Sequence, residues 1–251
     1  MRHGLLAVVL FSAGLAQAQQ LTGPEIISKV NEIMNPATSR ARMKMTIHTT
    51  TGRKRTFVYE SYSVNHGEKT LVRYVEPRRV AGQAILMLNH ADDIWIYFPR
   101  TNRVRKLATH AKRQKVEGSD FSYEDMGAGE AFITDFDAVL IGEEKVRGAR
   151  CYKLELRRRA DSNSSYSRMI MWVRRDDFVP VRVDYYDDRN PKLRVKRLEL
   201  SDIRTIDGIP TPMRMVMTDL LDNTQTELEF LDVRYNVKLP QEMFTERGLR
   251  K

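Results

Sequence analysis

The sequence predicts a mainly β protein (α+β) built on one large, curved antiparallel sheet with a helix near its N-terminus. Apolar and polar residues alternate with period two along most of the chain, and short Gly, Asn or Asp turns separate the alternating runs. Residues 22–35 show helical spacing instead. Because large sheets twist and curl, side chains, helices or a ligand must fill the concave face of this sheet.

The N-terminal residues have the pattern of an export signal. A short basic start precedes an apolar run from Leu5 to Leu15, which is too short to cross a bilayer. Ala16-Gln17-Ala18 matches a small-x-small cleavage site. We therefore expect a signal peptide over residues 1–18, one domain over residues 19–251 and a periplasmic location after cleavage. The alternative is a short anchor that stays uncleaved.

The predicted helix lies between Thr22, a capping residue, and Asn35-Pro36, which stop it. Its apolar stripe consists of Ile26, Ile27, Val30, Ile33 and Met34. The predicted strands follow as an antiparallel meander without a domain boundary. They are expected at residues 42–47, 56–61, 69–75, 83–88, 94–98, 104–107, 133–141, 151–157, 168–173, 181–186, 193–200, 211–218, 226–230 and 233–235.

Methionine is abundant, with 12 residues in the chain, and several occur at i, i+2 on predicted strands. That spacing places each group on one face of its strand. Methionine suits surfaces that accept varied apolar partners, so these residues are candidates to line a cavity for acyl chains; packing of the core beneath the helix is the equal alternative. Two strands, 84–88 and 94–98, are apolar on both faces and add further candidates, with a tightly packed core again the alternative. The candidate cavity residues are Met43, Met45, Leu86, Leu88, Trp95, Tyr97, Met169, Met171, Met213, Met215 and Met217.

The sequence contains no Gly-x-Ser-x-Gly elbow, phosphate-binding Gly-rich loop or His-Glu-x-x-His motif, so we predict neither an enzyme nor a bound cofactor or metal. The single cysteine, Cys151, is expected to be a buried or half-buried small apolar residue rather than a nucleophile. His90-Ala91-Asp92-Asp93 is interpreted as a turn. Ser119/Asp120 are interpreted as a helix cap and Glu124/Asp125 as first-turn acids, and pairing of these two acids with the basic strand 103–106 is a further hypothesis.

The formal net charge of +9 attracts acidic partners. No nucleic-acid-binding motif is present, so we expect no nucleic acid. Anionic lipid headgroups or an acidic protein are the candidate partners, and a merely solvated basic surface is an equal alternative. Arg103, Arg105 and Lys106 are the candidate contacts for a headgroup or partner.

The segment from Asp93 to Met126 carries a family resemblance. Trp95, Tyr97, Pro99, Arg103, Arg105 and Lys106 form a patterned hairpin, and Gly-Ser-Asp-Phe-Ser-Tyr-Glu-Asp follows at 118–125. This combination resembles the LolA-like outer-membrane lipoprotein-sorting proteins, a group with LolA, LolB and RseB types.

The resemblance implies an open, incomplete β-barrel covered by an N-terminal helix and short helical lid segments. It implies a periplasmic carrier that binds lipid or lipoprotein acyl chains in an apolar cavity. Such a carrier moves its cargo between an inner-membrane transporter, here of the RND type, and the outer membrane, with transient contact at the membrane surface. The alternative is a periplasmic lipid-responsive sensor of the RseB type.

Overall fold

The computed structural model describes residues 21–251, apart from the side chain of Thr109. The predicted signal peptide, residues 1–18, lies outside them. Among the helices of the described residues, none combines the length and the apolar character needed to span a bilayer.

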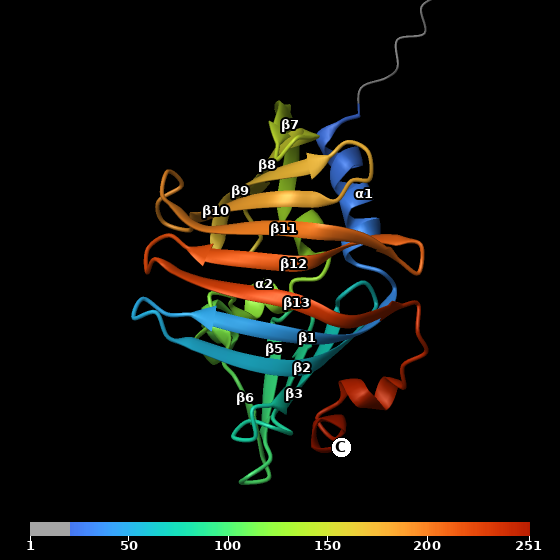
Figure 1. Cartoon of the computed structure of the whole chain (residues 1–251), viewed down its shortest axis with the longest axis vertical. Coiled ribbons are helices and arrows are strands. Elements are labelled where there is room, and N and C mark those ends of the chain that lie inside the picture. Colours follow the sequence, from blue (N-terminus) through green and yellow to red (C-terminus); the bar gives the residue numbers. More distant parts are fainter. Residues whose placement is uncertain (1–20) are drawn as a thin grey trace, which may run out of the picture.

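The described chain forms one 13-stranded antiparallel sheet (Figure 1). The sheet order is β6-β5-β4-β3-β2-β1-β13-β12-β11-β10-β9-β8-β7, so β1 and β13 pair at its centre and β6 and β7 are its open edges. The strands are β1 (Thr38–His48), β2 (Lys54–Val64), β3 (Lys69–Glu76), β4 (Ala84–Leu88), β5 (Asp93–Phe98), β6 (Arg103–Lys106), β7 (Phe136–Val146), β8 (Ala149–Arg158), β9 (Tyr166–Arg174), β10 (Pro180–Asp187), β11 (Arg194–Ile206), β12 (Ile209–Asp219) and β13 (Thr224–Tyr235).

The predicted mainly β class and curved antiparallel sheet are confirmed, with two local differences. Residues 131–134 form a short helix rather than the start of β7. The runs 226–230 and 233–235 belong to one strand, β13. The pairing of β1 with β13 shifts between Arg42 and Met43, which leaves Leu231 unpaired and 51% exposed. Because such a bulge reverses the alternation of side chains, the single strand has the sequence pattern of two.

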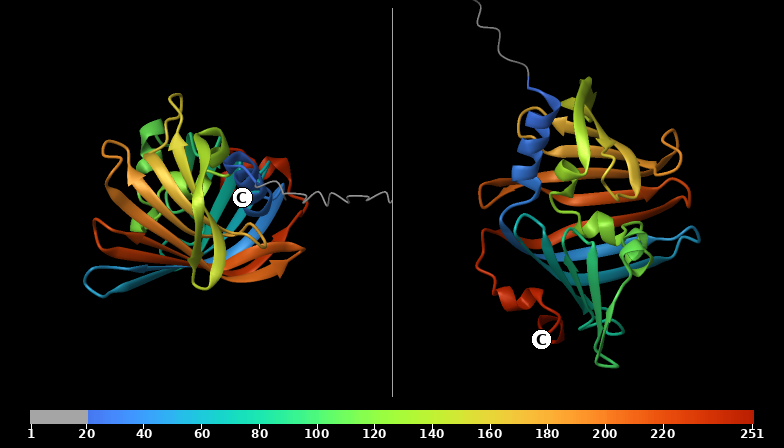
Figure 2. Two further views of the ribbon diagram at one scale, coloured as in Figure 1. Left: turned by 90° about the horizontal axis from the view of Figure 1, so that it is seen from above. Right: turned by 180° about the vertical axis from the view of Figure 1, so that it is seen from behind.

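The N-terminal helix α1 (Gly23–Met34) begins at Thr22, as predicted, with a capping box in which the Glu25 carboxylate accepts a hydrogen bond from the Thr22 backbone N–H at 2.7 Å. Its buried side chains Ile26, Ile27 and Val30 join a core formed with strands β7 to β11. Burying each such side chain contributes roughly 1.5–3 kcal/mol. The helix therefore covers the concave face at the β7 end of the sheet (Figure 2).

The connection from β6 to β7 covers the rest of the concave face (Figure 2). We call residues 107–135 the strap; it contains η1 (Thr109–Arg113), η2 (Val116–Gly118), α2 (Tyr123–Gly127) and α3 (Ala131–Thr134). Its side chains Val116, Phe121 and Tyr123 pack into a second core, with Phe57 and Tyr59 of β2 among its members. The expected N-terminal helix and short helical segments over an open sheet are thus present.

The C-terminal segment, residues 237–251, covers the other face of the β2–β5 region with η3 (Gln241–Phe244) and η4 (Gly248–Arg250). Phe244 and Leu249 are buried there against side chains of β3 and β4. The Arg73 guanidinium donates hydrogen bonds to the backbone carbonyls of Gly248 and Leu249, both at 3.3 Å. Strands β4 and β5 are therefore apolar on both faces because each face has its own cover.

Candidate functional site: a cavity beneath the strap

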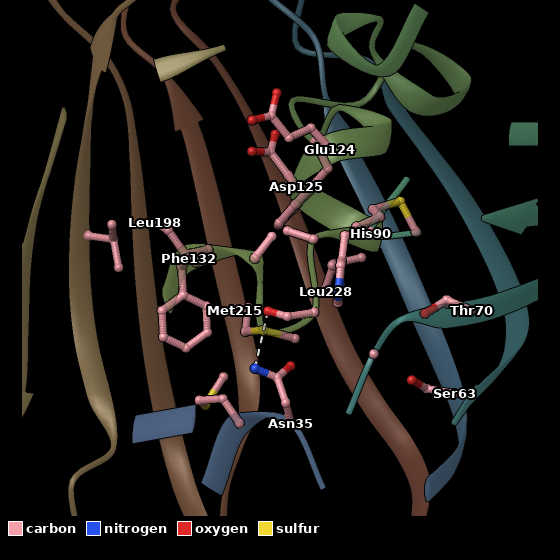
Figure 3. Close-up of a pocket in the computed structure, with 18 of the residues that line it drawn as sticks. Asn35, Ser63, Thr70, His90, Glu124, Asp125, Phe132, Leu198, Met215 and Leu228 are labelled. Atoms are coloured by element: carbon pink, nitrogen blue, oxygen red, sulfur yellow. Dashed lines mark hydrogen bonds between the residues drawn. The ribbon is translucent and has the colours of Figure 1, made fainter. Parts of the chain in front are cut away.

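A cavity of about 380 Å³ lies between the concave face of the sheet, α1 and the strap. This volume is within the roughly 300–1,000 Å³ typical of small-molecule sites. Most of its wall is apolar, and Figure 3 shows Phe132, Leu198, Met215 and Leu228 around it. The apolar lining residues include Val30, Met43, Tyr59, Phe121, Met126, Phe132, Met169, Met171, Val183, Leu198, Leu200, Met215, Leu228 and Phe230.

The predicted methionines divide between the cavity and the core. Met43, Met169, Met171 and Met215 come from β1, β9 and β12 and line the cavity together. Met45 and Met217 are completely buried in the neighbouring core and do not line the cavity, and Met213 packs against the same core. Of the two alternatives considered from the sequence, a cavity wall describes Met43, Met169, Met171 and Met215, and a packed core describes the other predicted methionines.

Leu86, Leu88, Trp95 and Tyr97 are not brought to the cavity. They lie on the opposite face of β4 and β5, in the cluster that the C-terminal segment covers. The concave side of these strands carries their alternates, Ile85, Met87, Ile94 and Ile96. Since both faces are equally apolar in sequence, only the position of the C-terminal segment distinguishes them.

Arg103, Arg105 and Lys106 also lie away from the cavity. They are exposed on the edge strand β6, and none is among the residues that line the cavity. The Lys106 amine lies 2.7 Å from the Asp93 carboxylate and 4.7 Å from the centre of the Trp95 ring. The structure therefore gives these residues no contact with a group bound inside the cavity.

The sequence motif at residues 118–125 anchors one side of the strap to the centre of the sheet. The buried Asp120 carboxylate accepts a hydrogen bond from the Thr226 hydroxyl of β13 at 2.6 Å. The Lys115 amine lies 2.9 Å from the Asp219 carboxylate and 2.6 Å from that of Asp222. The cap predicted at Ser119/Asp120 is wrong, because Ser122 caps α2.

The other side of the strap is anchored by the two adjacent acids. The Glu124 carboxylate accepts hydrogen bonds from the Ser164 hydroxyl at 2.6 Å and the Ser165 N–H at 3.0 Å. The Asp125 carboxylate accepts bonds from Lys196 at 2.8 Å and the Tyr166 hydroxyl at 2.7 Å. These partners replace the pairing with residues 103–106 considered from the sequence.

The Asp125 side chain is only 3% exposed, which opposes its ionised form. Burial alone would raise the pKa of this carboxyl, but the charge of Lys196 and the hydrogen bonds from Lys196, Ser122 and Tyr166 outweigh it and hold the pKa below its ordinary value. Asp125 therefore remains a carboxylate, and its ion pair with Lys196 joins α2 to β11 beside the cavity.

His90 is a cavity residue that the sequence did not identify. The predicted turn is confirmed, but Asn89, His90 and Ala91 all adopt left-handed backbone angles, with φ of 52°, 55° and 66°. Non-glycine residues rarely do so, and such strain is concentrated at functional sites. The turn places His90 in the cavity wall, where its buried Nδ1 has no hydrogen-bond partner (Figure 3). The sequence Asn-His after an apolar strand is compatible with left-handed backbone angles, but it does not indicate that His90 lines a cavity.

One rim of the cavity is closed by two glycines. A Cβ on Gly67, in the β2–β3 turn, would lie 2.5 Å from the Cα of Gly129 in the strap. The Asn35 side-chain amide at the end of α1 donates to the Gly129 carbonyl at 3.1 Å (Figure 3). The backbones of the turn and the strap therefore meet here without intervening side chains, and the Asn35 side chain joins the helix end to the strap.

We expect Gly67→Ala to destabilise the protein more than Gly52→Ala. Both glycines have positive φ, 87° and 75°, so both variants carry a left-handed cost of about 1–2 kcal/mol. Only Gly67 also faces backbone, whereas a Cβ on Gly52 meets nothing within 4 Å. The clash adds about 1–3 kcal/mol. Denaturant unfolding of the two variants measures the difference, and equal losses would contradict the close contact.

No group of three or more His, Cys, Asp or Glu residues within 21–251 is arranged to hold a metal ion. Cys151 is buried, within the predicted range of buried or half-buried, and its burial raises the pKa of the thiol. Neither observation adds a second candidate site to the cavity.

Comparisons with known proteins agree on the fold. A family model described only as an uncharacterized protein matches residues 66–251, more than half of the chain. A search of curated proteins found no match. The solved structure of a DUF1329 family protein from Desulfovibrio piger is 28% identical and superposes with a TM-score of 0.82, covering 90% of this chain and 97% of its own.

Two other solved structures are similarly close. A domain named for outer membrane lipoprotein sorting, from Vibrio parahaemolyticus, is 26% identical with a TM-score of 0.81, over 91% of this chain and 98% of its own. A LolA superfamily protein from Nitrosomonas europaea is 23% identical with a TM-score of 0.77, over 91% and 100%. The latter likeness is one of fold.

Proposed function

Because the chain belongs to the LolA-like family, we propose that it is a periplasmic carrier that holds an acyl chain of a lipid or lipoprotein in its cavity. In this role it takes cargo from an inner-membrane transporter, an RND-type exporter in our proposal, and delivers it to the outer membrane. The observation that supports this function is the cavity of about 380 Å³ beneath the strap, whose wall includes Met43, Met169, Met171 and Met215.

The apolar wall supports acyl-chain binding by its chemistry. Methionine side chains are flexible and polarizable, so Met43, Met169, Met171 and Met215 can adapt to chains of different length and unsaturation. Each buried methylene contributes about 0.8 kcal/mol, so about ten of them contribute about 8 kcal/mol before the cost of association. That gross energy sets a limit of about 1 μM on the dissociation constant, and the cost of association weakens the affinity from there.

The strap supports uptake and release. It is attached to the sheet largely through side chains, with Asp120 and Lys115 on one side and Glu124 and Asp125 on the other. Breaking one set of contacts would swing the strap without unpairing a strand of the sheet. The exposed residues Arg103, Arg105 and Lys106 remain our candidates for transient contact with an anionic membrane surface, outside the cavity.

Native mass spectrometry of the mature protein, purified from the periplasm and followed by lipid extraction, tests this function. We expect a population carrying one defined lipid or acylated peptide. A protein that is ligand-free and also ignores added lipids would overturn the carrier. In that case, co-purification with a membrane-bound regulator would favour the sensor alternative.

A further inference from the structure

One wall of the cavity carries a row of hydroxyl groups. Ser39 of β1 pairs in register with Ser63 of β2, and Ser63 pairs with Thr70 of β3. Directly paired residues on neighbouring antiparallel strands share a face, with Cβ atoms about 4.5–5.5 Å apart. All three residues line the cavity. Their hydroxyls therefore form a continuous line across three strands.

His90 extends this line beyond β3. Its backbone N–H donates to the Glu68 carbonyl at 3.3 Å, which holds the turn after β4 next to the start of β3. Figure 3 shows His90, Thr70 and Ser63 on one side of the cavity and Phe132 and Leu198 on the other. We call Ser39, Ser63, Thr70 and His90 the polar row.

The polar row has hydrogen-bonding capacity that the described protein does not use. The buried Nδ1 of His90 has no partner. The hydroxyls of Ser39, Ser63 and Thr70 have no hydrogen-bond partner among residues 21–251, although all three residues line the cavity. Leaving polar groups unpaired beside an apolar ligand costs free energy. A ligand that forms hydrogen bonds with them therefore binds more tightly than one that does not.

The charge of the cavity wall indicates which polar group fits. The charged lining residues among those described are Lys112, Glu124, Asp125 and Asp135, so carboxylates outnumber cations. The Lys112 amine is already bonded to the Asp92 carboxylate at 2.9 Å and to the Asn163 side chain. A carboxylate or phosphate brought into the cavity would therefore lose its hydration without gaining a free cation.

We propose that the cavity binds an amphiphile whose inserted polar group is uncharged, a hydroxyl or ester attached to an apolar chain, with the polar row as its hydrogen-bonding site. The methionines of β9 and β12, Met169, Met171 and Met215, then hold the chain. This inference rests on the proposed carrier function and specifies its ligand class. It assigns the selection of cargo to Ser39, Ser63, Thr70 and His90, rather than to the basic residues of β6.

Displacement of the apolar fluorophore N-phenylnaphthylamine by two ligands of the same chain length tests this class. The ligands are monomyristoylglycerol, which is neutral, and myristate, measured at about pH 8, where carboxyl groups are ionised. We expect the neutral ligand to bind roughly tenfold more tightly, the effect of about two net hydrogen bonds. The double variant S63A/T70V should lose this preference and keep its affinity for the fluorophore.

Ser201→Ala is the matched control, because Ser201 pairs with Arg214 in the same sheet and does not line the cavity. It should retain the full preference. If myristate binds as tightly as the neutral ligand and S63A/T70V changes neither affinity, the polar row is not a ligand site, although the carrier stands. If neither ligand nor fluorophore binds the folded protein, the carrier function itself fails, and the ligand class with it.

Discussion

Replacing Met215 by Glu will abolish lipid binding while the protein stays folded. Met215 is half-buried in the cavity wall, and its register partners on β11 and β13, Leu200 and Leu228, also line the cavity. Among the described residues that line the cavity, the one Lys or Arg is Lys112, which is already paired with Asp92, so a carboxylate at 215 has no free cation beside it once a chain excludes water. Burying an unpaired charge costs several kcal/mol, so affinity for a lipid should fall at least about 100-fold.

Two further variants separate the cavity from general destabilisation. Met215→Trp adds bulk to the cavity without charge and should also block binding. Met243→Glu changes a half-buried methionine in the C-terminal segment, outside the cavity, and should leave binding intact. Binding is measured by fluorophore displacement and folding by circular dichroism. A folded Met215→Glu protein that binds lipid normally would show that the cavity is not the lipid-binding site.

Replacing Asp125 by Ala will cost about 3–5 kcal/mol of the free energy of unfolding, because it leaves the Lys196 ammonium, whose side chain is only 12% exposed, without its partner. It also removes the capping box of α2. Denaturant unfolding measures the loss. Adding Lys196→Met to Asp125→Ala should recover part of it, since the unpaired charge is then gone.

Asp222→Ala provides the matched comparison. Its carboxylate also joins strap to sheet, through Lys115, but its side chain is 63% exposed. An exposed pair contributes at most about 1 kcal/mol, so this variant should lose far less stability than Asp125→Ala. Equal losses in the two variants would show that the buried pair does not hold the strap.

The same carboxylate makes stability depend on pH. Because the folded-state pKa of Asp125 is held below its unfolded value of about 3.9, its stabilisation is fully present above that pH. The stabilisation is lost as pH falls through the folded pKa. The difference in unfolding free energy between the wild-type protein and Asp125→Asn should therefore shrink below about pH 4. A difference that stays constant into that acid range would contradict the ionised pair.

Elements governed by local pattern were predictable from the sequence. Thr22, the apolar stripe of α1 and Asn35-Pro36 specify a helix and its ends without reference to the rest of the chain. Period-two alternation specifies the strands, but it missed the start of β1 at Thr38 and the end of β11 at Ile206, and it failed where a bulge at Leu231 or the helical turn at 131–134 interrupts it. The pairs Met169/Met171 and Met213/Met215 follow from the same periodicity, which fixes that they share a face but not what that face contacts.

The site needed contacts between distant segments. The sequence does not show that Asp125 meets Lys196, 71 residues away, or that the motif at 118–125 anchors a strap. Ser39, Ser63 and Thr70 are ordinary polar positions until strand register aligns them on the concave face.

The sequence by itself determined the elements, the curved antiparallel sheet and which side chains share a face, because backbone periodicity and capping act over a few residues. Only the tertiary structure decided which faces enclose the cavity. Leu86 and Trp95 are as apolar as Met171 and Met215, yet the C-terminal segment covers the first pair and the cavity opens beside the second. Burial on an apolar face is favourable wherever cover is supplied, so the position of that cover, set by long-range packing, locates the site.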